Sequence, residues 1–130
     1  MIPAESIMNN LPKETSAISY AKEVSDRASE VGFDWLDISK VWEKIFEEIT
    51  ELEDAITHSP KDIEEELGDV LFSIVNLARH LRLDPELALS KSNKKFIARF
   101  TAIERNLAEK NKLISDCAEI ELEELWGAQK

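Results

Sequence analysis

The sequence predicts an all-α protein. Only three glycines and four prolines occur among its 130 residues, so few positions interrupt a helix. Consecutive β-branched residues are rare, which disfavours strands. Apolar residues recur at spacings of three and four, the period of a helix that buries one side. We therefore expect a bundle of about four helices in one domain, because a chain of this length can build one substantial core.

The first helix is expected within "KETSAISYAKEVSDRASEVG", residues 13–32. Thr15 or Ser16 suits its N-cap, and Gly32 suits the residue that follows its last turn. The next residues, "FDWLDIS", form a short connection. Asp37 or Ser39 is expected to cap the helix that follows.

The second and third helices are expected to form an antiparallel hairpin. The second runs from about Ile38 to Thr57, and the third from about Lys61 to Leu81, with Pro60 in the break between them. A connection this short makes the two helices neighbours. The apolar face of the second helix is expected to contain Val41, Ile45, Ile49, Leu52 and Ile56.

The fourth helix starts at "LRLDPE", where Asp84 suits the N-cap and Pro85 the first helical position. It is expected to continue to about residue 110. The tail "CAEIELEELWGAQK" indicates a short amphipathic helix that ends near Gly127. We assign residues 1–14 to an N-terminal extension and residues 15–130 to one helical domain with this short C-terminal helix.

The charge and composition exclude several classes of function. A formal charge of −11, from 27 acidic and 16 basic residues, repels nucleic acid polymers and anionic lipid surfaces. No apolar run is long enough to span a membrane, and the N-terminus lacks the layout of a signal peptide. The single cysteine, Cys117, has no partner for an internal disulfide. We expect a cytoplasmic protein.

Two acidic groups lie in the predicted hairpin, within "EEITE" and "EELGD". Glu48 and Glu51 share one helix face, and so do Glu66 and Asp69, because residues three apart are neighbours on a helix. Glu48 borders the apolar side of its helix, whereas Glu47 points well away from it.

The third helix is expected to be largely buried, because apolar residues surround most of its circumference between Leu67 and Ala78. Its polar residues keep to one narrow stripe, which should face a polar cleft or a thin strip of water. The stripe contains Asp62, Glu66, Asp69, Ser73, Asn76 and His80.

Charge repulsion makes a bound cation one explanation of the acidic groups. Two carboxylates about 4 Å apart repel by about 1 kcal/mol in water and about 4 kcal/mol at an effective dielectric constant of 20. A divalent cation removes this cost, and an all-oxygen site favours Mg²⁺, with Mn²⁺ as a substitute, over zinc. The alternative is a solvated acidic face with ion pairs to Lys44 or Lys61. Spacing alone leaves both interpretations open.

Motifs spread over most of the chain resemble the MazG family of nucleoside triphosphate pyrophosphohydrolases, and most closely the C-terminal domain of its two-domain members. The resemblance covers residues 12–126 and is carried by "VGFDW", "EKIFEEITEL", "EEELGDVLFSIVNLARHL", "DPELALSKSNKKFIARF" and "EELW". It implies the all-alpha NTP pyrophosphatase fold, a four-helix-bundle-like domain that forms a homodimer. It also implies Mg²⁺-dependent cleavage of a nucleoside triphosphate into monophosphate and pyrophosphate.

The resemblance also implies roles for individual residues. Glu48, Glu51, Glu66 and Asp69 match the family's metal ligands, and Glu47 would lie beyond them or orient water. The nucleotide-holding positions of the family match Lys95, Arg99 and Trp126. The alternatives for these three are solvated cations and an indole that covers the core. We assign Phe33 and Trp35 to packing, and Asn76 and His80 to structural hydrogen bonds.

Two other functions remain open at this point. A non-catalytic helical dimerisation or regulatory module would keep the acidic surface without chemistry. A hydrolase of narrower specificity, for dUTP, dCTP or phosphoribosyl-ATP, would keep the same site.

Overall fold

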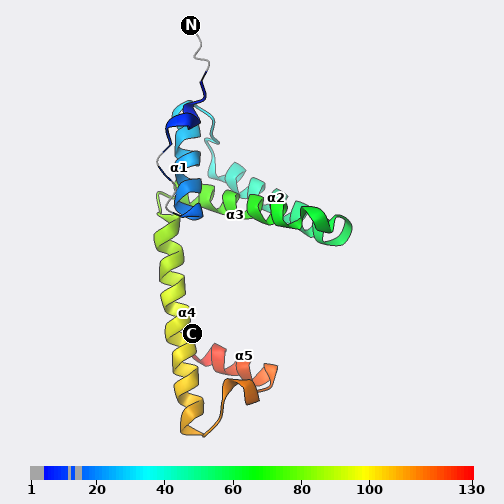
Figure 1. Cartoon of the computed structure of the whole chain (residues 1–130), viewed down its shortest axis with the longest axis vertical. Helices are drawn as coiled ribbons and strands as arrows, with labels where there is room; N and C mark the ends of the chain where they lie inside the picture. The colour runs from blue at the N-terminus through cyan, green and yellow to red at the C-terminus, as the bar shows by residue number, and fades with distance from the viewer. Residues whose placement is uncertain (1–4, 12, 14–15) are drawn as a thin grey trace. The chain divides into compact units, whose positions relative to one another are not determined.

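The computed structural model describes residues 5–11, 13 and 16–130, and this part of the chain contains helices and no strand (Figure 1). The all-α prediction is confirmed. The described residues divide into two compact units between Glu86 and Leu87, and each unit is considered by itself. The helices of the first unit are η1 (Ile7–Asn10), α1 (Ala17–Glu30), α2 (Ile38–His58), η2 (Pro60–Asp62) and α3 (Ile63–His80).

Helix α1 begins and ends as its sequence predicts. The Ser16 hydroxyl accepts a hydrogen bond from the backbone N–H of Ser19 at 3.1 Å, so Ser16 is the N-cap. The other predicted cap, Thr15, lies outside the described residues. Gly32 follows the helix with a φ of +87°, a conformation that glycine adopts without steric cost.

Helices α2 and α3 form the predicted antiparallel hairpin and lie side by side, with α1 packed on α3 (Figure 1). Asp37 caps α2, because its carboxylate accepts the backbone N–H of Ser39 at 3.0 Å. The short η2 occupies the predicted start of the third helix near Lys61, and α3 itself begins at Ile63. Pro60 at the start of η2 explains this tighter first turn.

The core of the first unit lies between the facing sides of the hairpin. Val41 and Ile45 of α2 and Val75 of α3 are at most 6% exposed. The prediction that Ile56 belongs to this face is wrong, because Ile56 is 57% exposed and Ala55 is buried in its place. Spacings that alternate between four and three bring Ala55, and not Ile56, under Val41 and Ile45.

The burial of α3 differs from the prediction. Leu67, Leu71 and Ile74 are 46% to 54% exposed in the chain, whereas Ser73 and Asn76 of the polar stripe are buried. The helix is therefore not buried on most sides, because α1 and α2 cover only one of its faces. The polar stripe does face inward at Ser73 and Asn76. This places polar side chains next to the acidic pairs of the hairpin.

Helix α4 (Pro85–Glu109) starts where predicted, with the Asp84 carboxylate accepting the backbone N–H of Glu86 at 2.9 Å. The second unit contains the rest of α4, then η3 (Ile114–Asp116) and α5 (Glu119–Ala128). Its buried apolar residues are Ile103 and Leu107 of α4. In the described residues, no helix has the length and apolar character needed to cross a membrane.

Candidate metal centre

Three carboxylates converge on the hairpin. Glu48 and Glu51 lie one turn apart on α2, and Glu66 lies on the facing side of α3. One oxygen from each carboxylate falls within 4.8 Å of the other two. The antiparallel pairing of the two helices therefore brings together three of the four predicted metal ligands.

Two oxygens of this group are buried without a partner. Glu48 is only 7% exposed, and its Oε1 accepts a hydrogen bond from Lys44 Nζ at 2.8 Å. Glu48 Oε2 and Glu66 Oε2 are the buried side-chain oxygens that have no hydrogen-bond partner among the described residues. Leaving a buried carboxylate oxygen unsatisfied costs free energy. A hard divalent cation between these oxygens would satisfy both, so the donor set fits Mg²⁺ or Mn²⁺.

The acids repel one another in the folded chain. The charge of Glu48, followed by desolvation, raises the pKa of Glu51 above its usual value. Desolvation raises the pKa of Glu66, and the charges of Glu51 and Asp69 raise it further. Both shifts mean that the site resists holding all its negative charges without a compensating cation.

The fourth predicted ligand, Asp69, lies outside the group of three converging oxygens and is exposed. It follows Glu66 by one turn of α3. Asp69 lines a cavity of about 160 Å³ together with Lys44 and Glu48. The same face of the hairpin thus holds all four acids, with Asp69 at the edge of the cluster.

Lys44 is a further residue of the site. The sequence predicts it only as an ion-pair partner in a solvated acidic face. Its Nζ lies 2.8 Å from Glu48 Oε1 and 3.7 Å from Glu47 Oε1. The hydrogen bond to Glu48 raises the pKa of Lys44 and keeps it charged. Its spacing of four residues before Glu48 was the signal for this contact. Glu47 itself is mostly exposed, as predicted.

The predicted nucleotide-holding residues lie in the second unit. The Arg99 guanidinium sits 5.6 Å from the ring centroid of Trp126, and Phe96 packs on the same indole at 5.1 Å between centroids. Lys95 precedes Arg99 by one turn and is exposed. Trp126 therefore packs against α4, and its indole also holds the Arg99 guanidinium.

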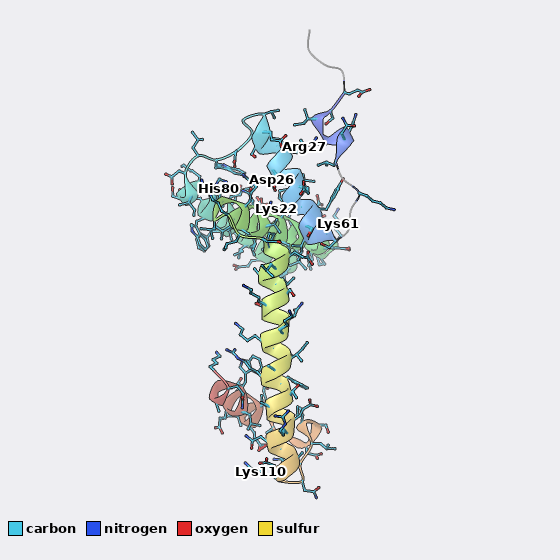
Figure 2. The ribbon with its side chains drawn as sticks, turned by 90° about the vertical axis from the view of Figure 1, so that its left-hand side faces the viewer. Lys22, Asp26, Arg27, Lys61, His80 and Lys110 are labelled. Carbon is cyan, nitrogen blue, oxygen red and sulfur yellow. The ribbon has the colours of Figure 1, made fainter. Side chains whose placement is uncertain are left out.

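A network of polar side chains lies at the C-terminal end of α3, where the polar stripe ends. Asp34, in the connection between α1 and α2, accepts hydrogen bonds at Oδ1 from Arg79 at 2.6 Å and from the backbone N–H of Trp35 at 2.8 Å. Its Oδ1 also lies 2.9 Å from His80 Nε2. His80 is labelled in Figure 2. The bond from Arg79 lowers the pKa of Asp34. Arg79 also donates to Asn76 Oδ1, so Asn76 and His80 make the predicted structural hydrogen bonds.

The fold and the acidic site define an all-α domain with a candidate carboxylate metal centre. Residues 37–103 match the MazG nucleotide pyrophosphohydrolase domain family. This match covers more than half of the chain, so the chain belongs to that family.

Two curated relatives extend the similarity. A protein of Thermotoga maritima named nucleoside triphosphate pyrophosphohydrolase/pyrophosphatase MazG is 49% identical over 115 residues, which are 88% of this chain and 44% of that protein. A nucleoside triphosphate pyrophosphohydrolase of Escherichia coli K12 is 38% identical over 129 residues, which are 96% of this chain and 49% of that protein. The chain thus spans about half the length of each relative.

Proposed function

We propose that this chain hydrolyses nucleoside triphosphates between the α and β phosphorus atoms, releasing a nucleoside monophosphate and pyrophosphate. The observation that carries the proposal is the group of Glu48, Glu51 and Glu66, with two buried oxygens that lack a partner. The names of the two curated relatives support the same reaction.

Glu48, Glu51, Glu66 and Asp69 would hold Mg²⁺. When bound, the ion neutralises phosphate oxygens and lowers the pKa of a coordinated water. The three converging carboxylates provide fixed oxygens from two helices, and Asp69 extends the set along α3. The hairpin thereby holds the ligands on regular helices, which position side chains more rigidly than loops do.

Lys44 and Glu47 would act around the ligands. Lys44 fixes the rotamer of Glu48 through their 2.8 Å hydrogen bond and adds positive charge on the side where phosphates would bind. Glu47 is exposed and one residue from Glu48, so it can accept a hydrogen bond from the attacking water and orient it.

Lys95, Arg99 and Trp126 would hold the nucleotide. The two cations lie one turn apart on α4 and would stabilise negative charge on the leaving pyrophosphate. Trp126 supports Arg99 through the stacking of its indole against the guanidinium. We further propose that residues 15–130 act as one catalytic domain and that two copies form a homodimer, which would cover Leu67, Leu71 and Ile74 of α3.

The direct test is product identification after incubation with Mg²⁺ and each common nucleoside triphosphate. We expect monophosphate and pyrophosphate, and no orthophosphate. Glu51→Gln should lower kcat by about 100-fold or more, because it removes one charged ligand. Glu53→Gln, at an exposed position on the same helix, is the matched control and should retain full activity. Equal rates for Glu51→Gln and the unmodified protein would contradict the proposed site.

Two alternatives predict different results. A non-catalytic dimerisation module should show no Mg²⁺-dependent binding of a non-hydrolysable nucleotide by calorimetry. A hydrolase restricted to dUTP, dCTP or phosphoribosyl-ATP should cleave one member of a substrate panel far faster than the rest. Broad cleavage across the panel would exclude both alternatives.

A further inference from the structure

A cavity connects the acidic site to aromatic side chains of the first unit. Its volume is about 160 Å³, and it is lined by Glu48 and Asp69 as well as by Trp35, Phe72 and Asn76. A second cavity, of about 250 Å³, is lined by the same Trp35, Phe72 and Asn76. The two cavities therefore share these three lining residues.

Asn76 has an unused hydrogen-bond donor at this junction. It is only 7% exposed, and its Oδ1 accepts hydrogen bonds from Arg79 Nε at 3.2 Å and Nη2 at 2.9 Å. Because arginine can only donate, these bonds fix which end of the amide is oxygen. Asn76 lines the cavity, and its Nδ2 group has no hydrogen-bond partner among the described residues. Nδ2 is not among the fully buried side-chain atoms that lack a partner, so it is open to solvent and free to donate to a ligand.

We propose that the slot formed by Trp35, Phe72 and Asn76 receives the base of the nucleotide, and that Asn76 Nδ2 donates a hydrogen bond to it. This inference rests on the proposed function and changes the assignment of Trp35 and Asn76 from packing and structural roles alone. The ligand class is a nucleoside triphosphate whose base directs a carbonyl oxygen or ring nitrogen toward Asn76.

The spacing along α3 suits such a ligand. Asp69 and Asn76 lie seven residues apart, which is two turns and about 10 Å along the helix axis. The phosphates would lie at the Glu66 and Asp69 end, where the metal ligands converge, and the base at the Asn76 end. Trp35 and Phe72 are 39% and 43% exposed, so both rings offer open surface against which a base can stack.

Asp34 is a positioning residue for this slot. Its Oδ1 accepts the Trp35 N–H and binds Arg79, which in turn holds Asn76. One carboxylate thus holds the backbone at Trp35 and, through Arg79, the orientation of the amide that donates to the base.

The rival position for the base is the indole of Trp126 in the second unit. Phe96 and Arg99 already pack against this indole. In the slot on the hairpin, two aromatic rings and an amide donor line the same cavity as Glu48 and Asp69, so the slot carries the assignment.

The test compares nucleotides with a ligand that lacks a base. Asn76→Asp keeps an oxygen for Arg79 and replaces the amide donor by an acceptor. With the full chain and Mg²⁺, it should raise the Kd of α,β-imido analogues of ATP, GTP, CTP and UTP by about tenfold or more relative to the Kd of the α,β-imido analogue of ribose 5-triphosphate. The ratio removes any general effect of the added charge, because both ligands carry the same triphosphate.

Trp35→Leu should change the same ratio in the same direction. Asn106→Asp, at an exposed position on α4, and Trp42→Leu, at an exposed position on α2, are the matched controls and should leave it unchanged. Circular dichroism and thermal melting establish that each variant is folded before binding is measured.

Three results would overturn the inference. Equal losses for nucleotides and ribose 5-triphosphate in Asn76→Asp would show that the amide does not contact the base. A changed ratio in Trp126→Leu but not in Asn76→Asp would place the base in the second unit. Failure of the unmodified chain to bind or cleave any triphosphate would overturn the proposed function as well, so the two failures are distinguishable.

Discussion

The hairpin of α2 and α3 and the unit of α4 and α5 both gather charged residues, but in opposite ways. On the hairpin, Glu48 is 7% exposed and two carboxylate oxygens are buried without a partner. On α4, Lys95 is exposed and Arg99 already stacks on Trp126. The close, partly buried negative charges of the hairpin lower the stability of the folded chain. The cations on α4 lower it little.

This difference determines what each region indicates about function. Buried carboxylate oxygens without a partner among the described residues are costly, so the hairpin favours a bound cation before any relative is considered. Exposed cations on a helix are common in proteins without a binding role. The role of Lys95 and Arg99 therefore depends on the family to which the chain belongs.

The sharpest test of this comparison is Glu66→Gln. We expect kcat to fall by about 100-fold or more, because one charged, partly buried proposed metal ligand is lost. In the absence of metal, the same variant should melt at a higher temperature than the unmodified protein, since it removes a carboxylate that its neighbours repel. Loss of activity and gain of metal-free stability should therefore occur together.

Glu64→Gln is the matched control for that variant, because it neutralises an exposed acid on the same helix. It should change neither the rate nor the melting temperature appreciably. A Glu66→Gln protein that melts lower than the unmodified chain without metal would show that the carboxylates do not repel one another as described.

Neutralising α4 should give a different pattern. We expect Arg99→Met to lower kcat/KM by about tenfold to 100-fold, because it removes a charge proposed to stabilise the leaving group. Calorimetric binding of Mg²⁺ alone should not change, since the proposed metal ligands lie on the hairpin. Lys91→Met, one turn before Lys95 and equally exposed, is the control and should keep its activity. Loss of Mg²⁺ binding in Arg99→Met would contradict this division of roles.

Much of the fold was predictable from the sequence, because helix ends are determined locally. Three helices are capped by short polar residues that precede a segment with regularly spaced apolar residues, namely Ser16, Asp37 and Asp84. Pro60 separates α2 from α3. The errors have a tertiary cause. The exposure of Ile56 and of the outer face of α3 depends on which neighbours cover each helix, and periodicity does not specify this.

The site was predictable in part for the same reason. Helical spacing placed Glu48, Glu51 and Glu66 on facing sides of a hairpin, and the structure brings them together. Arg79 and Asp34 were missed, because 45 residues separate them and no local pattern links them. The Trp35 slot was missed with them, since it forms only when the connection before α2 docks on α3.

Removal of this docking contact should destabilise the first unit. Asp34→Asn replaces a carboxylate that binds Arg79 and lies 2.9 Å from His80, and we expect a loss of about 1 to 3 kcal/mol in the free energy of unfolding. Because the pKa of Asp34 is lowered in the folded state, its contribution is present above the ordinary value of 3.8 and is lost as pH falls through the lower, folded-state pKa. Urea unfolding between pH 2 and pH 7 measures both effects, with exposed Asp54→Asn as the control.

The smallest expected effect is the dependence of metal stabilisation on pH. The pKa values of Glu51 and Glu66 are raised in the folded chain, so the metal-free protein binds more protons than the unfolded chain and loses stability as pH rises from about 4.5 through the raised values. Mg²⁺ binds the deprotonated acids and should reverse this loss. The rise in melting temperature caused by a fixed Mg²⁺ concentration should therefore be larger at pH 7 than at pH 5. An equal rise at both pH values would mean that the ion binds elsewhere, and the charges of the hairpin would then be no different in kind from those of α4.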